Sequence, residues 1–132
     1  IRIFLRTKER LIASEDQHGL IPAGSWVFMR SDWRKVASSD NYANIIDGTA
    51  HHPGPDNECL HWMIDERDML GCGTECIGTD AGIAVSFDPP LLCHYLCMAL
   101  CMARGKRGLE CITNLDLLPS TGAVILCPPL KK

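Results

Sequence analysis

Four polar residues in the second half of the chain are of the types that do chemistry in α/β proteins: Thr79, Asp80, His94 and Glu110. An imidazole and a carboxylate can together hold a divalent metal ion, so we interpret His94 and Glu110 as the corner of a metal site. Thr79 and Asp80 end a predicted buried strand, where α/β folds commonly carry site residues, and we expect both to bind substrate. The alternative is that Asp80 only caps the turn before Gly82.

Runs of apolar residues predict the elements that position these side chains. Strands are expected at residues 1–5, 25–30, 71–80 and 123–127, and helices at residues 7–18, 56–69 and 108–118, with residues 91–104 as a helix or an extended arm. Buried strands with helices between them favour an α/β fold with a mixed sheet and flanking helices.

Two helix boundaries carry recognisable capping residues. Asp56 is a candidate N-cap, because its carboxylate can accept a backbone N–H from the first turn. Gly19 is a candidate end for the first helix, since glycine tolerates the left-handed backbone found there. The charged residues 65–68 are interpreted as a solvent-exposed face rather than as a catalytic carboxylate pair.

Residues 31–54 show no clear period. A segment this long in a compact domain is usually a lid, a binding loop or an interface arm. Its end carries His51 and His52, which could be metal ligands. Two exposed polar residues before a proline turn are the favoured interpretation.

Composition excludes several classes of protein. The net charge of -3 offers no basic surface for nucleic acid. No apolar segment reaches the roughly 18 residues of a membrane helix. Arg2 and Arg6 interrupt the apolar N-terminus, so a signal peptide is not expected. We therefore expect a cytoplasmic protein that binds neither nucleic acid nor a membrane.

The 8 cysteines invite a disulfide interpretation, but most lie in apolar runs, where free Cys acts as a small hydrophobe. On a helix, Cys93, Cys97 and Cys101 would share one stripe, and three thiols could bind a soft metal. Packing is the favoured interpretation, because the spacing does not match usual zinc or iron–sulfur patterns.

Four stretches together resemble the C-terminal part of a known family: IPAGSWVFMRSDWRK at 21–35, HHPGPDNECLHWMIDERDMLGCGTECIGTDAG at 51–82, FDPPLLCHYL at 87–96 and GLECITNLDLLPSTGAVILCPPLK at 108–131. The family is that of the cyclase-type metal-dependent hydrolases, which include kynurenine formamidase and isatin hydrolase. The resemblance covers most of the chain from about Gly19 onward.

This resemblance implies that residues 1–132 are one domain with a partial swivelling β/α/β-type cyclase fold, the C-terminal part of a longer cyclase-like domain. It implies hydrolysis of amide-like bonds in a small-molecule substrate, with zinc or manganese as the cofactor and His94 and Glu110 among its ligands. Family members form dimers or larger assemblies. We therefore expect a homo-oligomer, with Trp33 and Tyr42 at the interface.

The sequence departs from the family pattern at two points. The upstream metal motif H-x-G-T-H-x-D-x-P-x-H is absent, and the similar string at residues 73–75 has no histidine beside it. In addition, His94 and Glu110 are separated by one four-residue unit more than in the family. The neighbouring copies CMAL and CMAR, at 97–100 and 101–104, indicate an insertion or a tandem duplication. On a helix such a unit adds about 6 Å, so both residues can reach one ion only if the insert bulges out.

Two functions from different classes remain open at this point. The chain is either part of a metal-dependent amide hydrolase or a non-catalytic relative that serves as a binding or oligomerisation module. The family resemblance favours the first, and the two departures favour the second.

Overall fold

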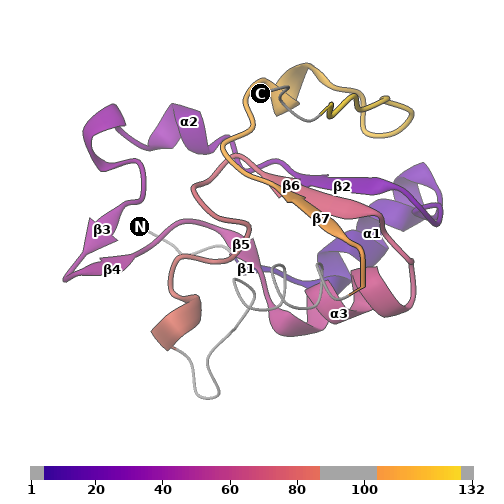
Figure 1. Cartoon of the computed structure of the whole chain (residues 1–132), viewed down its shortest axis with the longest axis horizontal. Coiled ribbons are helices and arrows are strands. Elements are labelled where there is room, and N and C mark those ends of the chain that lie inside the picture. The colour runs from indigo at the N-terminus through magenta and orange to yellow at the C-terminus, as the bar shows by residue number, and fades with distance from the viewer. Residues whose placement is uncertain (1–4, 87–103, 129–132) are drawn as a thin grey trace.

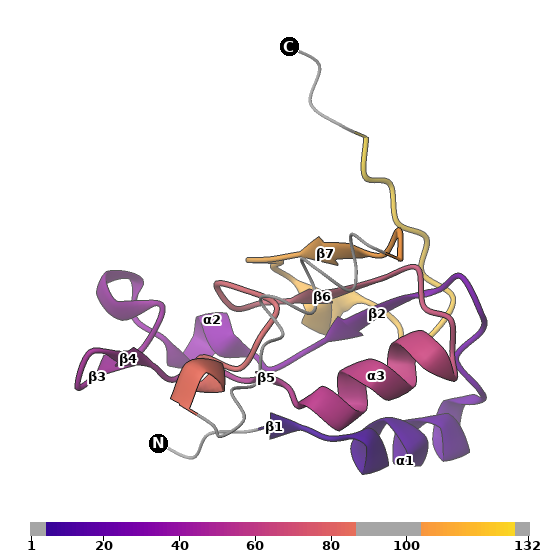
Figure 2. The ribbon, with the colours of Figure 1, turned by 60° about the horizontal axis from the view of Figure 1, so that its bottom comes forward.

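The computed structural model describes residues 5–86 and 104–128, which form an α/β fold (Figure 1). Its main sheet has three parallel strands in the order β2–β6–β7, with bounds Trp26–Met29, Gly71–Thr74 and Arg107–Leu109. Helices α1 (Lys8–His18) and α3 (Asn57–Asp65) lie side by side beneath this sheet (Figure 2). The predicted α/β class with flanking helices is therefore confirmed.

Short elements complete the fold. β1 (Leu5–Arg6) pairs in parallel with β5 (Gly54–Pro55), and β3 (Ile45–Ile46) pairs antiparallel with β4 (Thr49–Ala50). The β3–β4 hairpin turns at Asp47 and Gly48, which both have positive φ, as tight hairpin turns require. With helix α2 (Trp33–Val36), these elements give regular structure to much of the segment 31–54.

The hydrophobic core lies between the main sheet and the two helices. Val27 and Met29 of β2 are buried in it, whereas Trp26 and Phe28 are half-buried on the other face, because neighbouring strand residues point to opposite sides. The other fully buried members come from α3 and from the residues that follow it: Cys59, Leu60, Trp62, Met63, Ile64, Met69 and Cys72. This core sets the distance between the sheet and the two helices.

Helix α3 begins as predicted but ends earlier. Asp56 Oδ1 accepts the backbone N–H of Cys59 at 2.7 Å, so Asp56 is the N-cap. The helix stops at Asp65 rather than at residue 69, because Asp68 has a positive φ. The N–H of Met69 then turns back to the Met63 carbonyl at 3.1 Å.

A partly buried ion pair joins α1 to the turn after α3. The Glu15 carboxylate accepts Arg67 Nε at 2.7 Å, Arg67 Nη2 at 2.9 Å and the backbone N–H of Ile21 at 2.8 Å. The Arg67 guanidinium also lies 4.3 Å from the centre of the Trp62 ring. The prediction that residues 65–68 form only a solvated face is therefore wrong for Arg67.

The C-terminal end of α1 agrees with the prediction. Gly19 follows the helix with a φ of 90°, and its N–H donates to the Glu15 carbonyl at 2.8 Å. Strand β6, by contrast, is shorter than the predicted run 71–80. It ends at Thr74, whose hydroxyl donates to the Gly78 carbonyl at 2.9 Å and closes a turn.

The chain after β7 differs most from the prediction. Instead of a helix at 108–118, the structure has β7 and a 3₁₀ turn at Leu115–Leu117. Residues 123–127 are largely exposed and pair with no strand among the described residues, so the predicted buried strand is wrong. Most of the predicted segment 91–104 lies outside the described residues.

No disulfide joins the five cysteines in the described part of the chain, and Cys59, Cys72 and Cys76 among them are buried. Packing rather than disulfide bonding is confirmed for these three. Cys93, Cys97 and Cys101 lie outside the described residues. In the described ranges, no helix has both the length and the apolar character to cross a membrane.

Candidate functional site

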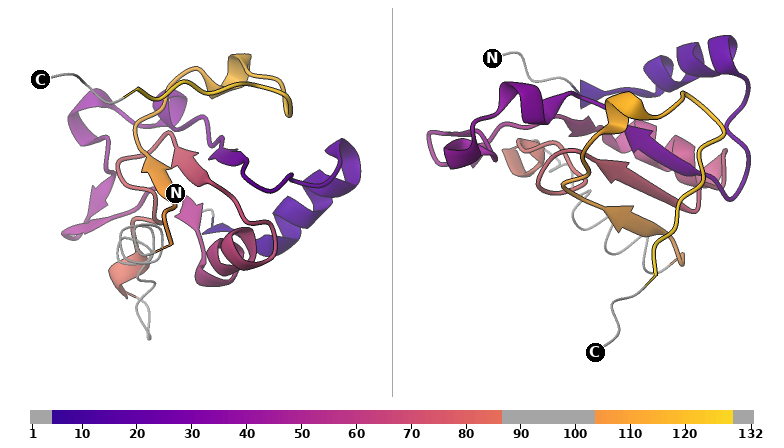
Figure 3. Two further views of the ribbon diagram at one scale, coloured as in Figure 1. Left: turned by 45° about the vertical axis from the view of Figure 1, so that its right-hand side comes forward. Right: turned by 90° about the horizontal axis from the view of Figure 1, so that it is seen from above.

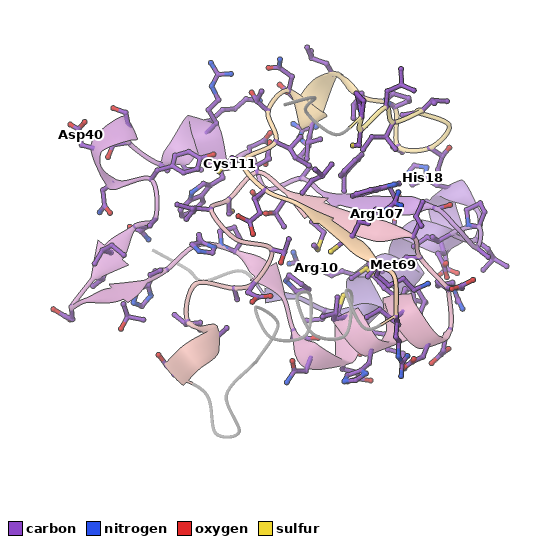
Figure 4. All side chains as sticks on the ribbon, in the orientation of Figure 1. Arg10, His18, Asp40, Met69, Arg107 and Cys111 are labelled. Atoms are coloured by element: carbon purple, nitrogen blue, oxygen red, sulfur yellow. The ribbon has the colours of Figure 1, made fainter. Side chains whose placement is uncertain are left out.

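The carboxyl ends of the three parallel strands meet at one edge of the main sheet. Residues 30–33 follow β2, residues 75–82 follow β6, and Glu110 follows β7. The N–H of Cys111 donates to the Cys76 carbonyl at 2.9 Å and ties two of these segments together. Figure 4 labels Cys111 at this edge, close to α2. Open α/β sheets bind ligands at this edge, so it is the candidate site.

Glu75 connects the segments at this edge through hydrogen bonds. Its buried carboxylate accepts the Ser31 N–H at 2.6 Å, the Ser31 hydroxyl at 3.0 Å and the Trp33 N–H at 3.3 Å. Its carbonyl accepts the Tyr42 hydroxyl at 2.5 Å. Sequence reasoning gave Glu75 no role, because no local signal marks a carboxylate that bonds to a distant backbone.

Trp33 belongs to the same network. It is buried, its indole N–H donates to the Tyr42 carbonyl at 2.8 Å, and its ring meets that of His52 edge-on at 6.5 Å. Trp33 therefore stabilises the segment 31–54 from within, which leaves it little surface for the expected contact with another copy.

An open cleft of about 540 Å³ lies along this edge, lined by Arg34, Ala37, Ser39, Tyr42, Cys111, Ile112 and Thr113. Arg34 Nη1 donates to Thr113 Oγ1 at 2.8 Å and so bridges α2 to the chain after β7. Burial raises the pKa of Tyr42, so its hydroxyl stays protonated at neutral pH. The cleft adjoins the residue that follows Glu110.

Thr79 and Asp80 are both buried in the loop after β6. This loop packs on the chain around His52, since the Gly82 N–H donates to the His52 carbonyl at 2.9 Å. The contact is so close that a Cβ at Gly54 would overlap the backbone of Asp80. The structure thus brings Thr79 and Asp80 to the expected edge, but neither lines the cleft.

His52 is a buried imidazole, although the sequence favoured an exposed side chain here. The residue is only 5% exposed, and its Nδ1 makes no hydrogen bond with any of the described residues. Burial lowers the pKa of His52, while the Pro53 backbone and the negative charge of Glu110 oppose that shift. The prediction of an exposed histidine is therefore wrong at this position. The close contacts of Gly54 and Gly82 bury it, and a sequence alone does not reveal them.

The described residues do not by themselves form a metal site. Glu110 is exposed and offers carboxylate oxygens, which suit zinc or manganese. Within residues 5–86 and 104–128, however, no three His, Cys, Asp or Glu side chains are grouped to hold an ion. His94, the predicted second ligand, lies outside these residues. A metal at Glu110 would need donors from beyond them.

Comparison with known proteins agrees with this fold. A family model described as "Putative cyclase" matches residues 3–81. The chain is 38% identical to isatin hydrolase from Roseibium aggregatum over 97% of its own length and 47% of that protein. Isatin hydrolase A from Labrenzia aggregata, bound to benzyl benzoate, superposes with a TM-score of 0.80 and 43% identity, over 90% of this chain and 44% of that one.

An isatin hydrolase bound to the product analogue thioisatinate superposes with a TM-score of 0.77 and 38% identity, again over 90% of this chain and 44% of that one. The chain therefore spans about half the length of the relatives that it matches. The family model covers more than half of the chain, and the fold and the sequence agree with it. The chain belongs to the cyclase family.

Proposed function

We propose that this chain forms part of the active site of a metal-dependent hydrolase that cleaves amide-like bonds in small molecules. Its relatives are isatin hydrolases, and isatin contains a lactam, which is a cyclic amide. The observation that carries the proposal is the placement of Glu110 at the carboxyl edge of the parallel sheet, beside the loop of Thr79 and Asp80. Ring opening adds one water across the bond between the carbonyl carbon and the nitrogen, and that bond breaks: the carbon gains a hydroxyl group and the nitrogen gains a proton.

Each predicted site residue has a role in this proposal. The Glu110 carboxylate and the His94 imidazole would hold zinc or manganese, together with further donors from beyond the described residues. The bound ion would supply Lewis-acid chemistry, which polarises a carbonyl and lowers the pKa of a water molecule. Thr79 and Asp80 offer a hydroxyl and a carboxylate that orient the N–H of the substrate.

Metal affinity of the purified chain tests these assignments. We expect Glu110→Gln and His94→Ala each to weaken zinc or manganese binding by at least about 10-fold. Loss of a residue that only hydrogen-bonds to a metal ligand already lowers metal affinity by about that factor. Isothermal titration calorimetry and metal analysis by mass spectrometry measure the effect. Glu66→Gln, an exposed carboxylate after α3, is the matched control and should bind metal as the parent does.

Hydrolysis is measured separately, by following isatin absorbance with added metal. Turnover that Glu110→Gln abolishes supports the proposal. Equal metal affinity in the parent, Glu110→Gln and His94→Ala would remove both residues from the ligand set.

The alternative is a non-catalytic cyclase-family module that binds a partner. It is favoured by the separation of His94 and Glu110, which exceeds the family spacing by one four-residue unit. A chain that binds no metal, and whose stability is unchanged by Glu110→Gln, would establish this alternative.

A further inference from the structure

Two cysteines meet at the carboxyl edge of the main sheet. Cys76 lies in the loop after β6, and Cys111 lies after β7. These two strands pair in parallel and lie side by side, so their carboxyl ends are at the same edge (Figure 3). The N–H of Cys111 donates to the Cys76 carbonyl at 2.9 Å. The next N–H, of Ile112, donates to the Thr74 carbonyl at 3.0 Å. These hydrogen bonds hold the two cysteines next to each other, and the proposed hydrolysis uses neither thiol.

The backbone places the two cysteines within reach of a disulfide bond. With standard bond lengths, a hydrogen bond of 2.9 Å from one backbone N–H to the other carbonyl keeps the two Cα atoms within about 6.7 Å of each other. Disulfide bonds usually join cysteines whose Cα atoms are about 4.4–6.8 Å apart. In the structure no disulfide joins them. The backbone can therefore accept a disulfide here while it keeps this hydrogen bond.

Both thiols lie near the hydroxyl of Tyr42. Cys111 lines the open cleft together with Tyr42. Burial is the main cause that raises the pKa of Tyr42, and the negative charges that Cys111 and Cys76 can carry add to it, as expected for nearby thiols. The Cys76 thiol lies 3.9 Å from the Ser31 hydroxyl, so formation of the disulfide involves a rotation of this side chain between rotamers.

Cys111 differs from the other residues with a left-handed backbone. Its φ is 53°. Apart from the glycines, the other described residues with a positive φ are all aspartate or asparagine, the types most often found in this conformation: Asp32, Asn44, Asp47, Asp68 and Asn114. Backbone geometry therefore favours another residue type at position 111, whereas the chemistry of a thiol requires cysteine.

We propose that Cys76 and Cys111 form a redox-active pair, which hydrogen peroxide converts into an intramolecular disulfide. The Cys111 sulfur attacks one peroxide oxygen, the O–O bond breaks and one water leaves, so Cys111 becomes a sulfenic acid. The Cys76 sulfur then attacks the Cys111 sulfur, the S–O bond breaks and a second water leaves. Together the two thiols lose two electrons and two protons, and the peroxide gains them.

The disulfide joins two segments of the candidate site. Cys76 shares its loop with Thr79 and Asp80, and Cys111 follows Glu110 directly. Oxidation therefore cross-links the loop that binds substrate in the proposed function to the residue beside the proposed metal ligand, and a thiol reductant reverses the link. Formation of the disulfide needs neither a metal nor hydrolysis, so this inference goes beyond the proposed function.

Peptide mapping tests the disulfide. The purified, reduced chain is treated with hydrogen peroxide, its remaining thiols are blocked with N-ethylmaleimide, and it is digested with Glu-C protease under conditions that cleave after both Glu and Asp. Cleavage at the acidic residues that flank both cysteines releases residues 76–80 and 111–116, each with a single cysteine. We expect these two peptides as one disulfide-linked species, from a chain that sediments as a monomer. Dithiothreitol should remove the linked species completely.

Substitutions separate this pair from the other cysteines. Cys111→Ser and Cys76→Ser should each abolish the linked species, whereas Cys127→Ser, which changes another exposed thiol, should leave it unchanged. Circular dichroism checks that Cys76→Ser folds, because Cys76 is buried. If that variant does not fold, Cys111→Ser decides the question.

The proposal is wrong if peroxide leaves residues 76–80 and 111–116 unlinked. It is also wrong if Cys111 links instead to another cysteine of the chain or to a second copy. Peptide mapping does not depend on turnover, so a failure of isatin hydrolysis does not change the interpretation of this experiment.

Discussion

Glu15 and Glu75 are both buried carboxylates, but they are satisfied in different ways. Glu15 has a cationic partner in Arg67, whereas Glu75 is held by backbone N–H groups and a hydroxyl. A buried carboxylate without such partners would be costly. Each one therefore fixes the relative position of two segments that lie far apart in the sequence.

Substituting Glu15 tests the ion pair. We expect Glu15→Gln to lower the free energy of unfolding by about 2 kcal/mol, since hydrogen bonds to charged groups contribute about that much. Urea denaturation measures the change. Asp16→Asn, an exposed neighbour on the same helix, should change stability by less than about 0.5 kcal/mol. Equal effects of the two variants would contradict the assigned role of Glu15.

The same pair predicts a pH dependence. The hydrogen bond from Arg67 lowers the pKa of Glu15 below its ordinary value of 4.5. The stabilisation is therefore fully present above pH 4.5 and is lost as the pH falls through the lower, folded-state pKa. The difference in stability between the parent and Glu15→Gln should shrink in acid, and denaturation curves across that range measure it.

Glu75→Ala tests the network at the sheet edge. It leaves the N–H groups of Ser31 and Trp33 without their acceptor, which should cost about 2 kcal/mol. Amide hydrogen exchange at these two residues should speed up, while exchange in α3 changes only with global stability. Unchanged protection at Ser31 and Trp33 would show that Glu75 does not hold the segment.

Among the elements, the start of β5 packs directly on the loop after β6, because Gly54 has no side chain. Gly54→Ala would place a methyl group in the backbone of Asp80 and Ala81. We expect it to destabilise the fold by more than about 2 kcal/mol, because overpacking against backbone cannot relax through a rotamer change. Thermal unfolding measures this effect.

Gly48→Ala is the matched control. It meets no neighbour within 4 Å but has a φ of 79°, so its cost is only the backbone strain of about 1–2 kcal/mol. A larger loss at Gly48 than at Gly54 would refute the assigned close packing.

Elements whose signals are local were predictable from the sequence. The helix α1, the stop at Gly19, the Asp56 cap and strand β2 all follow from capping chemistry and apolar runs. The length of β6 was not predictable, because it depends on the turn that Thr74 makes with Gly78. The burial of His52 was missed for a similar reason, since it depends on contacts between distant segments.

At the scale of the whole molecule, the described residues form a single core on one side of the sheet. The apolar run at 123–127 has the pattern of a buried strand, yet the described residues offer it no partner. A sequence pattern records the environment for which a segment is suited, and the described residues do not supply that environment here. The edge of the sheet was predicted as the site. Whether that site holds all the side chains that it needs could not be judged from Thr79, Asp80 and Glu110 alone.

The free thiols of Cys111 and Cys127 are both exposed. Exposed thiols oxidise readily in air, so two copies of the chain can become covalently linked during storage. Such linked copies would sediment as a dimer that a reductant separates into monomers. Association through apolar contacts would persist in the reductant. Preparations kept reduced, or carrying Cys111→Ser and Cys127→Ser, therefore separate chemical cross-linking from true assembly.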